Sequence, residues 1–99
     1  MNKITEKYEK NLLEDLLDPT EAAEYLKAAL EQGDQEIFLM ALRDVANAKG
    51  ISEIAREANL NRENLYRILS NKGSPKLASL ASVLRSLGLR LSVEVEKNA

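Results

Sequence analysis

The 99-residue sequence predicts a mainly α-helical domain with five helices, preceded by an N-terminal arm over residues 1–18 and followed by one β-strand over residues 89–96. Two observations support this prediction. Apolar residues recur every three or four positions through residues 19–88, which is the period of a helix with one buried face. From Leu89 the pattern changes to strict alternation, the period of a strand. A chain of this length suffices for one modest core, so residues 19–88 are expected to form a single domain.

The composition argues against several classes of protein. The chain has no Cys and no His, which removes disulfides, thiol nucleophiles, the commonest general base and the commonest transition-metal ligand. We therefore expect no catalytic residue, no metal site, no cofactor and no small-molecule substrate. No apolar run reaches the roughly 20 residues of a membrane span, and the polar N-terminus is unlike a signal peptide. A cytoplasmic protein without membrane association is expected.

Charge is unevenly distributed along the chain, although the formal net charge is only −2. Residues 1–48 carry a balance of −6, residues 49–76 a balance of +3 and residues 77–99 a balance of +1. This asymmetry favours a nucleic-acid-binding face in the middle of the chain and a different role for the acidic front. The basic patch is weak, which implies modest non-specific affinity for DNA. Dimerisation would double it.

The N-terminal arm carries a short apolar stripe made of Leu12, Leu13, Leu16 and Leu17. Two interpretations are open. The arm can fold back over the core, or it can dock on a partner protein.

Two longer helices are expected next. Thr20 begins the first, which ends at Gly33; Asp34 caps the second, which ends at Gly50. The second is apolar enough to be the most buried element of the fold. Its expected core residues are Ile37, Phe38, Met40, Ala41, Leu42, Val45 and Ala46.

Residues 51–70 contain two short helical patterns that meet across the joint Asn59-Leu60-Asn61. Ser52 is placed to cap the first helix and Asn61 the second, while Asn59 can leave the first helix in the left-handed conformation. The small Ala55 lets the two helices cross closely. This arrangement is typical of a helix-turn-helix whose second helix enters the major groove of DNA. A surface pair of helices with a solvated charged face is the alternative.

The second helix of this pair separates apolar from polar side chains. The inner side of the pair comprises Ile54, Ala58, Leu60, Leu65 and Ile68. The outer side can donate or accept hydrogen bonds throughout, through Arg62, Glu63, Tyr66, Arg67 and Ser70.

These outer residues suit the edges of DNA bases. Arg62 and Arg67 can each present a planar fork to guanine O6 and N7. Glu63 can accept from cytosine N4, and Tyr66 can bond a phosphate or touch a thymine methyl group. Ser52 and Asn61 lie at helix starts, where backbone N–H groups meet phosphates.

Residues 71–75 are expected to form a turn, with Gly73 free to take positive φ and Pro75 preset for the start of a helix. Lys72 and Lys76 flank the turn and are candidates for phosphate contacts; a solvated loop is the alternative. Ser74 should cap the last helix, which ends at Gly88. The apolar stripe of that helix comprises Leu77, Leu80, Ala81, Leu84 and Leu87.

The predicted C-terminal strand places Leu89, Leu91, Val93 and Val95 on one face. A single strand has no partner in an otherwise helical chain, and its edge would stay unpaired. We therefore expect it to pair with the same strand of a second protomer or to join a sheet of another protein. A tail folded over the core is the alternative.

The residues quoted above also carry a family resemblance. The run GISEIAREANLNRENLYRILS (residues 50–70), the turn NKGSP and the stretch from Leu80 to Leu89 resemble HigA-type addiction-module antidote proteins. These are small Cro/lambda-repressor-like (Xre-type) antitoxins encoded beside a RelE-like toxin. The resemblance covers roughly residues 8–96, with Asn59 standing where glycine is frequent in repressors.

The resemblance implies a dimeric, DNA-binding antitoxin that represses its own operon and neutralises a RelE-like toxin. Double-stranded operator DNA, the toxin and a second copy of the chain are the expected partners. A phage-type or housekeeping repressor without a toxin is the alternative, and a protein-interaction module that has lost DNA binding is a third. The toxin partner rests on the resemblance alone.

Overall fold

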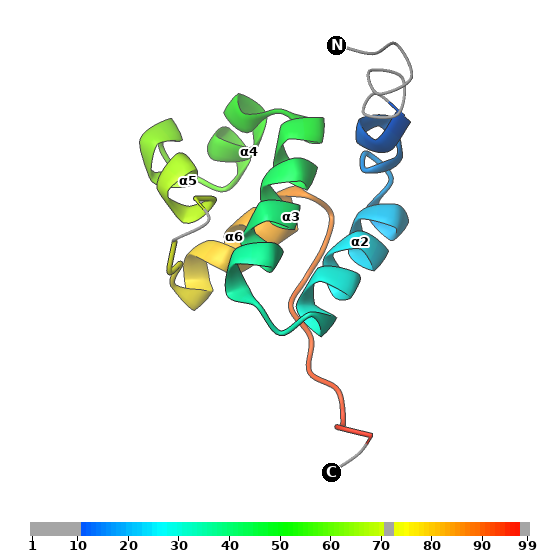
Figure 1. Cartoon of the computed structure of the whole chain (residues 1–99). Coiled ribbons are helices and arrows are strands. Elements are labelled where there is room, and N and C mark those ends of the chain that lie inside the picture. Colours follow the sequence, from blue (N-terminus) through cyan, green and yellow to red (C-terminus); the bar gives the residue numbers. More distant parts are fainter. Residues whose placement is uncertain (1–10, 71–72, 98–99) are drawn as a thin grey trace.

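The computed structural model describes residues 11–70 and 73–97. A helical stretch over residues 11–15 is followed by α2 (Pro19–Glu31), α3 (Gln35–Lys49), α4 (Ile51–Glu57), α5 (Arg62–Ile68) and α6 (Leu77–Ser86) (Figure 1). Helix α3 packs against α2 and α4, and α4 also packs against α5 and α6. The prediction of a mainly α-helical domain is confirmed. Within the described ranges, no helix is long and apolar enough to cross a membrane.

Aspartates begin the two longer helices. The Asp18 side chain accepts a hydrogen bond from the Thr20 N–H at 2.9 Å, and Asp34 accepts from the Glu36 N–H at 2.8 Å. The predicted Asp34 cap is thus confirmed. Helix α2 begins at Pro19, one residue before the predicted start, because proline has no N–H to leave unsatisfied in a first turn.

Two predicted serine caps are wrong. Gly50, at φ 118°, joins α3 directly to α4, so the latter already starts at Ile51 and Ser52 lies inside it. Helix α6 starts at Leu77, and its N-cap position is Lys76 rather than Ser74. Residues 73–76 have no regular secondary structure, so Ser74 lies three residues before the first residue of α6.

The core lies where α3 meets the other helices. Its largest fully buried side chains are Leu39, Leu42, Val45, Ile54, Leu65, Leu69 and Val83. Met40, predicted to be in the core, is 52% exposed, whereas its neighbour Leu39 is 1% exposed. At 3.6 residues per turn, Leu39 shares a face with Leu42 and Ala46, while Met40 shares one with the exposed Asn47.

Two more residues of the predicted core stripes lie at the surface. Ile37 is 37% exposed, and Leu77 in the first turn of α6 is 72% exposed. The leucines of the N-terminal arm are likewise partly buried and partly exposed. Leu16 is buried and Leu12 packs against the core, while Leu13 and Leu17 are 41% and 58% exposed.

The predicted C-terminal strand is not formed. Residues 89–96 have no regular secondary structure, and no strand occurs elsewhere in the described part of the chain. Leu89 packs against the core, and its N–H donates to the Leu84 carbonyl at 2.8 Å. A strand needs the backbone of a neighbour. The helices of a single chain offer it no such edge.

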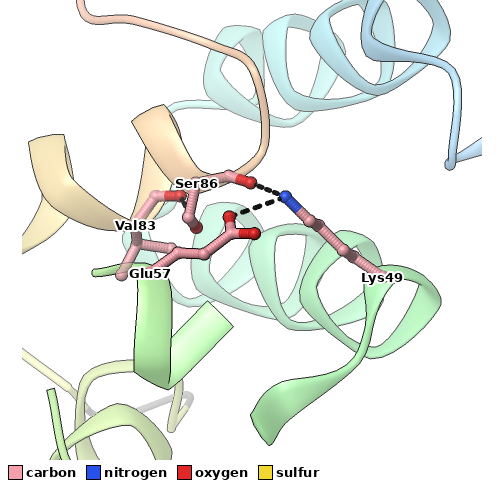
Figure 2. A network of polar contacts seen from close by, with 4 residues as sticks. All are labelled: Lys49, Glu57, Val83 and Ser86. Carbon is pink, nitrogen blue, oxygen red and sulfur yellow. Dashed lines mark hydrogen bonds and ion pairs between the residues drawn. The ribbon is translucent and has the colours of Figure 1, made fainter. Parts of the chain in front are cut away.

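A polar network joins the ends of three helices (Figure 2). The Lys49 ammonium, at the end of α3, donates to the carbonyl of Ser86 in α6 and to the Glu57 carboxylate of α4 at 3.0 Å. The Ser86 hydroxyl donates to the Val83 carbonyl at 2.6 Å. A cation beside the C-terminal carbonyls of a helix also stabilises the helix dipole. This network fixes α4 against α3 and α6.

The adjacent residues Leu39 and Met40 provide a matched test of this core. Leu39→Ala should lower the free energy of unfolding by about 2–5 kcal/mol, because it leaves a cavity among fully buried side chains. Met40→Ala should change it by less than about 0.5 kcal/mol, as expected for a surface position. Urea unfolding followed by circular dichroism measures both values; equal losses would contradict the assigned orientation of α3.

The network also predicts a pH dependence. The hydrogen bond from Lys49 holds the pKa of the Glu57 carboxyl below its ordinary value; burial opposes this shift, while the charges of Lys49 and Arg56 reinforce it. A lowered pKa contributes stability that is present above the unfolded-state pKa of about 4.3 and is lost as the pH falls through the folded-state value. Glu57→Gln should therefore flatten the loss of stability below about pH 4.3. Thermal unfolding between neutral and acidic pH tests this, with Glu94→Gln, on the exposed C-terminal segment, expected to follow the unmodified chain.

Candidate nucleic-acid interface

Helices α4 and α5 are joined by a tight connection. Asn59 has φ 57°, the left-handed conformation predicted for it. The next N–H, that of Leu60, donates back to the Ala55 carbonyl at 2.8 Å, which closes the end of α4. The Asn61 side chain accepts from the Asn64 N–H at 2.7 Å and so caps α5, also as predicted. The four residues Ala58–Asn61 thus fix the angle at which α5 leaves α4.

The two sides of α5 differ sharply in burial. Leu65 and Leu69 are 0% and 1% exposed, and Ile54 and Ala55 of α4 are buried beside them. Ala58 is also buried, while Leu60 and Ile68 are partly covered. The inner side of the pair is therefore the apolar one that the sequence predicts. Its outer side is free to meet another molecule.

The outer side presents most of the predicted DNA-binding residues to solvent. The exposed ones are Asn61, Arg62, Glu63, Tyr66 and Arg67. Ser70 is half-buried, and its hydroxyl donates to the Arg67 carbonyl at 3.0 Å, so it completes the end of α5. Lys76 is exposed at the start of α6. Ser52 is exposed on α4, and Lys72 lies outside the described residues.

Arg62 and Tyr66 are one turn apart and in contact. The Arg62 guanidinium lies 5.9 Å from the centre of the Tyr66 ring, and its Nη2 donates to the phenol oxygen at 3.3 Å. Stacking on an aromatic ring restricts the guanidinium without neutralising it. The contact holds the charged fork at the exposed start of α5.

Arg67 borders a hollow of about 310 Å³ between α5 and α6. Arg67 and Lys76 bring positive charge to its wall, and Asn64 and Ser79 bring polar side chains. Asn64 and Ser79 are not among the site residues predicted from the sequence. Their position in the first turn of each helix is a signal that could have found them, because first-turn side chains of both helices meet at this hollow. The remaining lining residues are Leu60, Ile68, Ser74 and Pro75.

The end of α5 is held by side chains of α3. Arg43 Nε donates to the Leu69 carbonyl at 3.0 Å, and Gln35 Nε2 donates to the Gly73 carbonyl at 2.8 Å. The Leu69 carbonyl follows the last turn of α5, where no intrahelical donor remains, and the Gly73 carbonyl lies between α5 and α6. Neither side chain is among the predicted site residues, since their partners lie 26 and 38 residues further along the chain.

Gly73 lies close to the backbone at the end of α5. A Cβ at this position would lie 2.8 Å from the Ile68 carbonyl oxygen, 2.9 Å from that of Arg67 and 3.0 Å from that of Ser70. Only glycine fits so close to the end of α5.

Basic residues of the middle of the chain thus have different roles. Lys49 is engaged with Glu57 and Ser86 and belongs to the fold. Arg62, Arg67 and Lys76 are exposed on or beside α5. The predicted partner-binding residues Leu89, Leu91, Val93 and Val95 lie on the separate C-terminal segment.

Comparison with known proteins gives one family and one close relative. A family model described as "probable addiction module antidote protein" matches residues 6–95. An uncharacterized protein of Haemophilus influenzae is 36% identical over 89 residues, which cover 90% of this chain and 92% of that protein. No solved structure matches the chain.

Proposed function

We propose that this chain, which belongs to the family of probable addiction module antidote proteins, is a HigA-type antitoxin that also reads operator DNA through α5 and represses its own operon. The family supports an antitoxin role and implies a toxin partner. The proposal adds that the protein acts as a homodimer, that the toxin is RelE-like and that the chain itself has no catalytic activity.

The observation that carries the DNA-binding proposal is the segregation of α5. On its inner side Leu65 is fully buried and Ile68 partly buried, while Asn61, Arg62, Glu63, Tyr66 and Arg67 are all exposed on a helix fixed at both ends. Arginine at these exposed positions can bond guanine O6 and N7 bidentately. Lys76 and the hollow beside Arg67 suit the phosphates that flank a reading helix.

A dimer follows from the way short reading helices recognise DNA. One seven-residue helix contacts few base pairs, so two copies on half-sites about 34–36 Å apart would supply specificity. Two copies also double the positive charge, which is small in a single copy.

Charge on the front half of the chain supports a separate toxin surface. On α2, Glu21, Glu24 and Glu31 are exposed, and Glu14 and Asp15 are exposed in the helical stretch before it. An acidic surface of this kind suits a basic RNA-binding toxin, since ribonucleases bind a polyanion. The acidic surface and α5 lie on different helices, so the two functions use different residues.

The DNA-reading role is tested by fluorescence anisotropy on the DNA upstream of the gene and on a scrambled duplex at two salt concentrations. Arg67→Ala and Arg62→Ala should each weaken binding to the upstream DNA by about 1–3 kcal/mol, roughly 5- to 150-fold in Kd, with a smaller effect on scrambled DNA. Lys27→Ala, which removes one positive charge on α2, is the control and should leave the preference intact. Equal losses on both duplexes for the two arginine variants would refute base reading by α5.

The toxin-neutralising role is tested by growth of bacteria that express the small neighbouring gene with this chain. Arg67→Ala should still restore growth while losing operator binding. The double variant Glu24→Lys/Glu31→Lys should fail to restore growth while keeping operator binding, because it reverses charge on α2 only. A neighbour without toxicity would favour a repressor with no toxin partner.

A further inference from the structure

The C-terminal segment, residues 90–96, carries apolar side chains that the single chain leaves exposed. Val93 is 96% exposed, Val95 is 90% exposed and Leu91 is 43% exposed. Leu89 is the last residue whose N–H is bound within the fold, and across the described residues the backbone of 90–96 makes no hydrogen bond. Figure 1 shows the segment running past the ends of α2 and α3 and out of the helical body. Exposed alternating apolar and β-branched residues are typical of an edge strand whose backbone is not yet paired.

The apolar side of this segment continues a hollow in the body of the protein. Leu91 lines a space of about 440 Å³ together with Leu30, Phe38, Leu39 and Leu80. Leu30 is itself 59% exposed beside this space. Because alternate residues of an extended chain share one side, Val93 and Val95 lie on the same side as Leu91 when the segment is extended. The apolar surface therefore runs from the hollow onto the segment.

We propose that this surface is covered by the same segment of a second copy, as an antiparallel two-stranded ribbon centred on Val93. This inference rests on the dimer of the proposed function and supplies its contact. In this register Leu91 of one chain lies opposite Val95 of the other, and Arg90 lies opposite Glu96. Each ribbon then holds three apolar pairs on one side and two Arg–Glu pairs on the other. The charges of the segment match a copy of itself, which favours a second copy over a different protein as the occupant.

Other registers are less favourable. A slip of one residue places apolar side chains opposite polar ones on every pair. Centring on Ser92 pairs Leu89 with Val95, yet the Leu89 N–H is bound to Leu84 and its side chain packs on the core. Centring on Glu94 places two like charges opposite each other. The register centred on Val93 avoids all three costs.

The experiment uses full-length chains and a charge swap between copies. Arg90→Glu and Glu96→Lys each replace both ion pairs of the ribbon by like charges, so each variant alone should dimerise roughly 10-fold more weakly or worse. A mixture of the two variants should form a heterodimer of nearly unmodified affinity, because each swapped position then faces an opposite charge. Sedimentation of labelled chains over a concentration series measures all three dissociation constants.

Glu94→Lys is the matched control, since it makes the same charge change two residues away. Its heterodimer with Arg90→Glu keeps one Glu–Glu contact between positions 90 and 96, so it should be weaker than the heterodimer of Arg90→Glu with Glu96→Lys. Restoration by Glu94→Lys instead of Glu96→Lys would refute the register. Unchanged dimerisation of both Arg90→Glu and Glu96→Lys, or a monomeric unmodified chain at all concentrations, would refute the ribbon.

The same chains separate this inference from the proposed function. A dimer with the predicted charge-swap behaviour that binds upstream and scrambled DNA equally would retain the ribbon and refute DNA reading. Specific binding to upstream DNA by a chain that does not form the ribbon would retain DNA reading and refute the inference.

Discussion

The shortness of α4 and α5 is the constraint on which the rest of the structure depends. Each has seven residues, whereas isolated helices below about 12–15 residues are marginal in water. Most of their backbone groups lie at a terminus and need partners outside the helix. Helix α3 supplies one of these partners through Arg43, and it binds the neighbouring segments at two further points. Lys49 holds α4 and α6 together, Arg43 binds the carbonyl of Leu69, and Gln35 binds the carbonyl of Gly73. The longest helix therefore acts as the scaffold for the two shortest.

The residues that hold α5 in place are different from those that α5 exposes to solvent. The residues that hold α5 in place come from α3, from the buried side of the helix pair and from the Asn61 cap. The exposed arginines take no part in this support, apart from the contact between Arg62 and Tyr66. A side chain that makes no contact within the fold can bind a ligand without first breaking such a contact. The backbone of α5 is thus already ordered in the free protein, so ordering it adds little to the cost of binding a ligand.

Sequence reasoning succeeded where the cause of a structure is local. The Asp34 and Asn61 caps and the left-handed Asn59 depend on neighbours a few residues away, and all three are found. It failed where the cause is distant. The burial of Leu39 instead of Met40 depends on which side of α3 meets the other helices, and the missing strand depends on a partner that the single chain lacks. Arg43 and Gln35 were not predicted for the same reason, because their hydrogen-bond partners are distant in the sequence. The outer side of α5 was predictable because it follows from helical period once its inner side is known.

The close approach at Gly73 has a consequence for how such proteins diverge. Three backbone carbonyl oxygens surround the position where a Cβ would lie. Replacing Gly73 by any other residue would therefore require the end of α5 to move. The exposed residues of α5 have no such restriction, because they can be exchanged without disturbing the packing beneath them. Under the proposed function, related chains could therefore acquire different operators by exchanging a few exposed side chains of α5. Gly73 would be retained in all of them, while the exposed residues of α5 that determine specificity would differ.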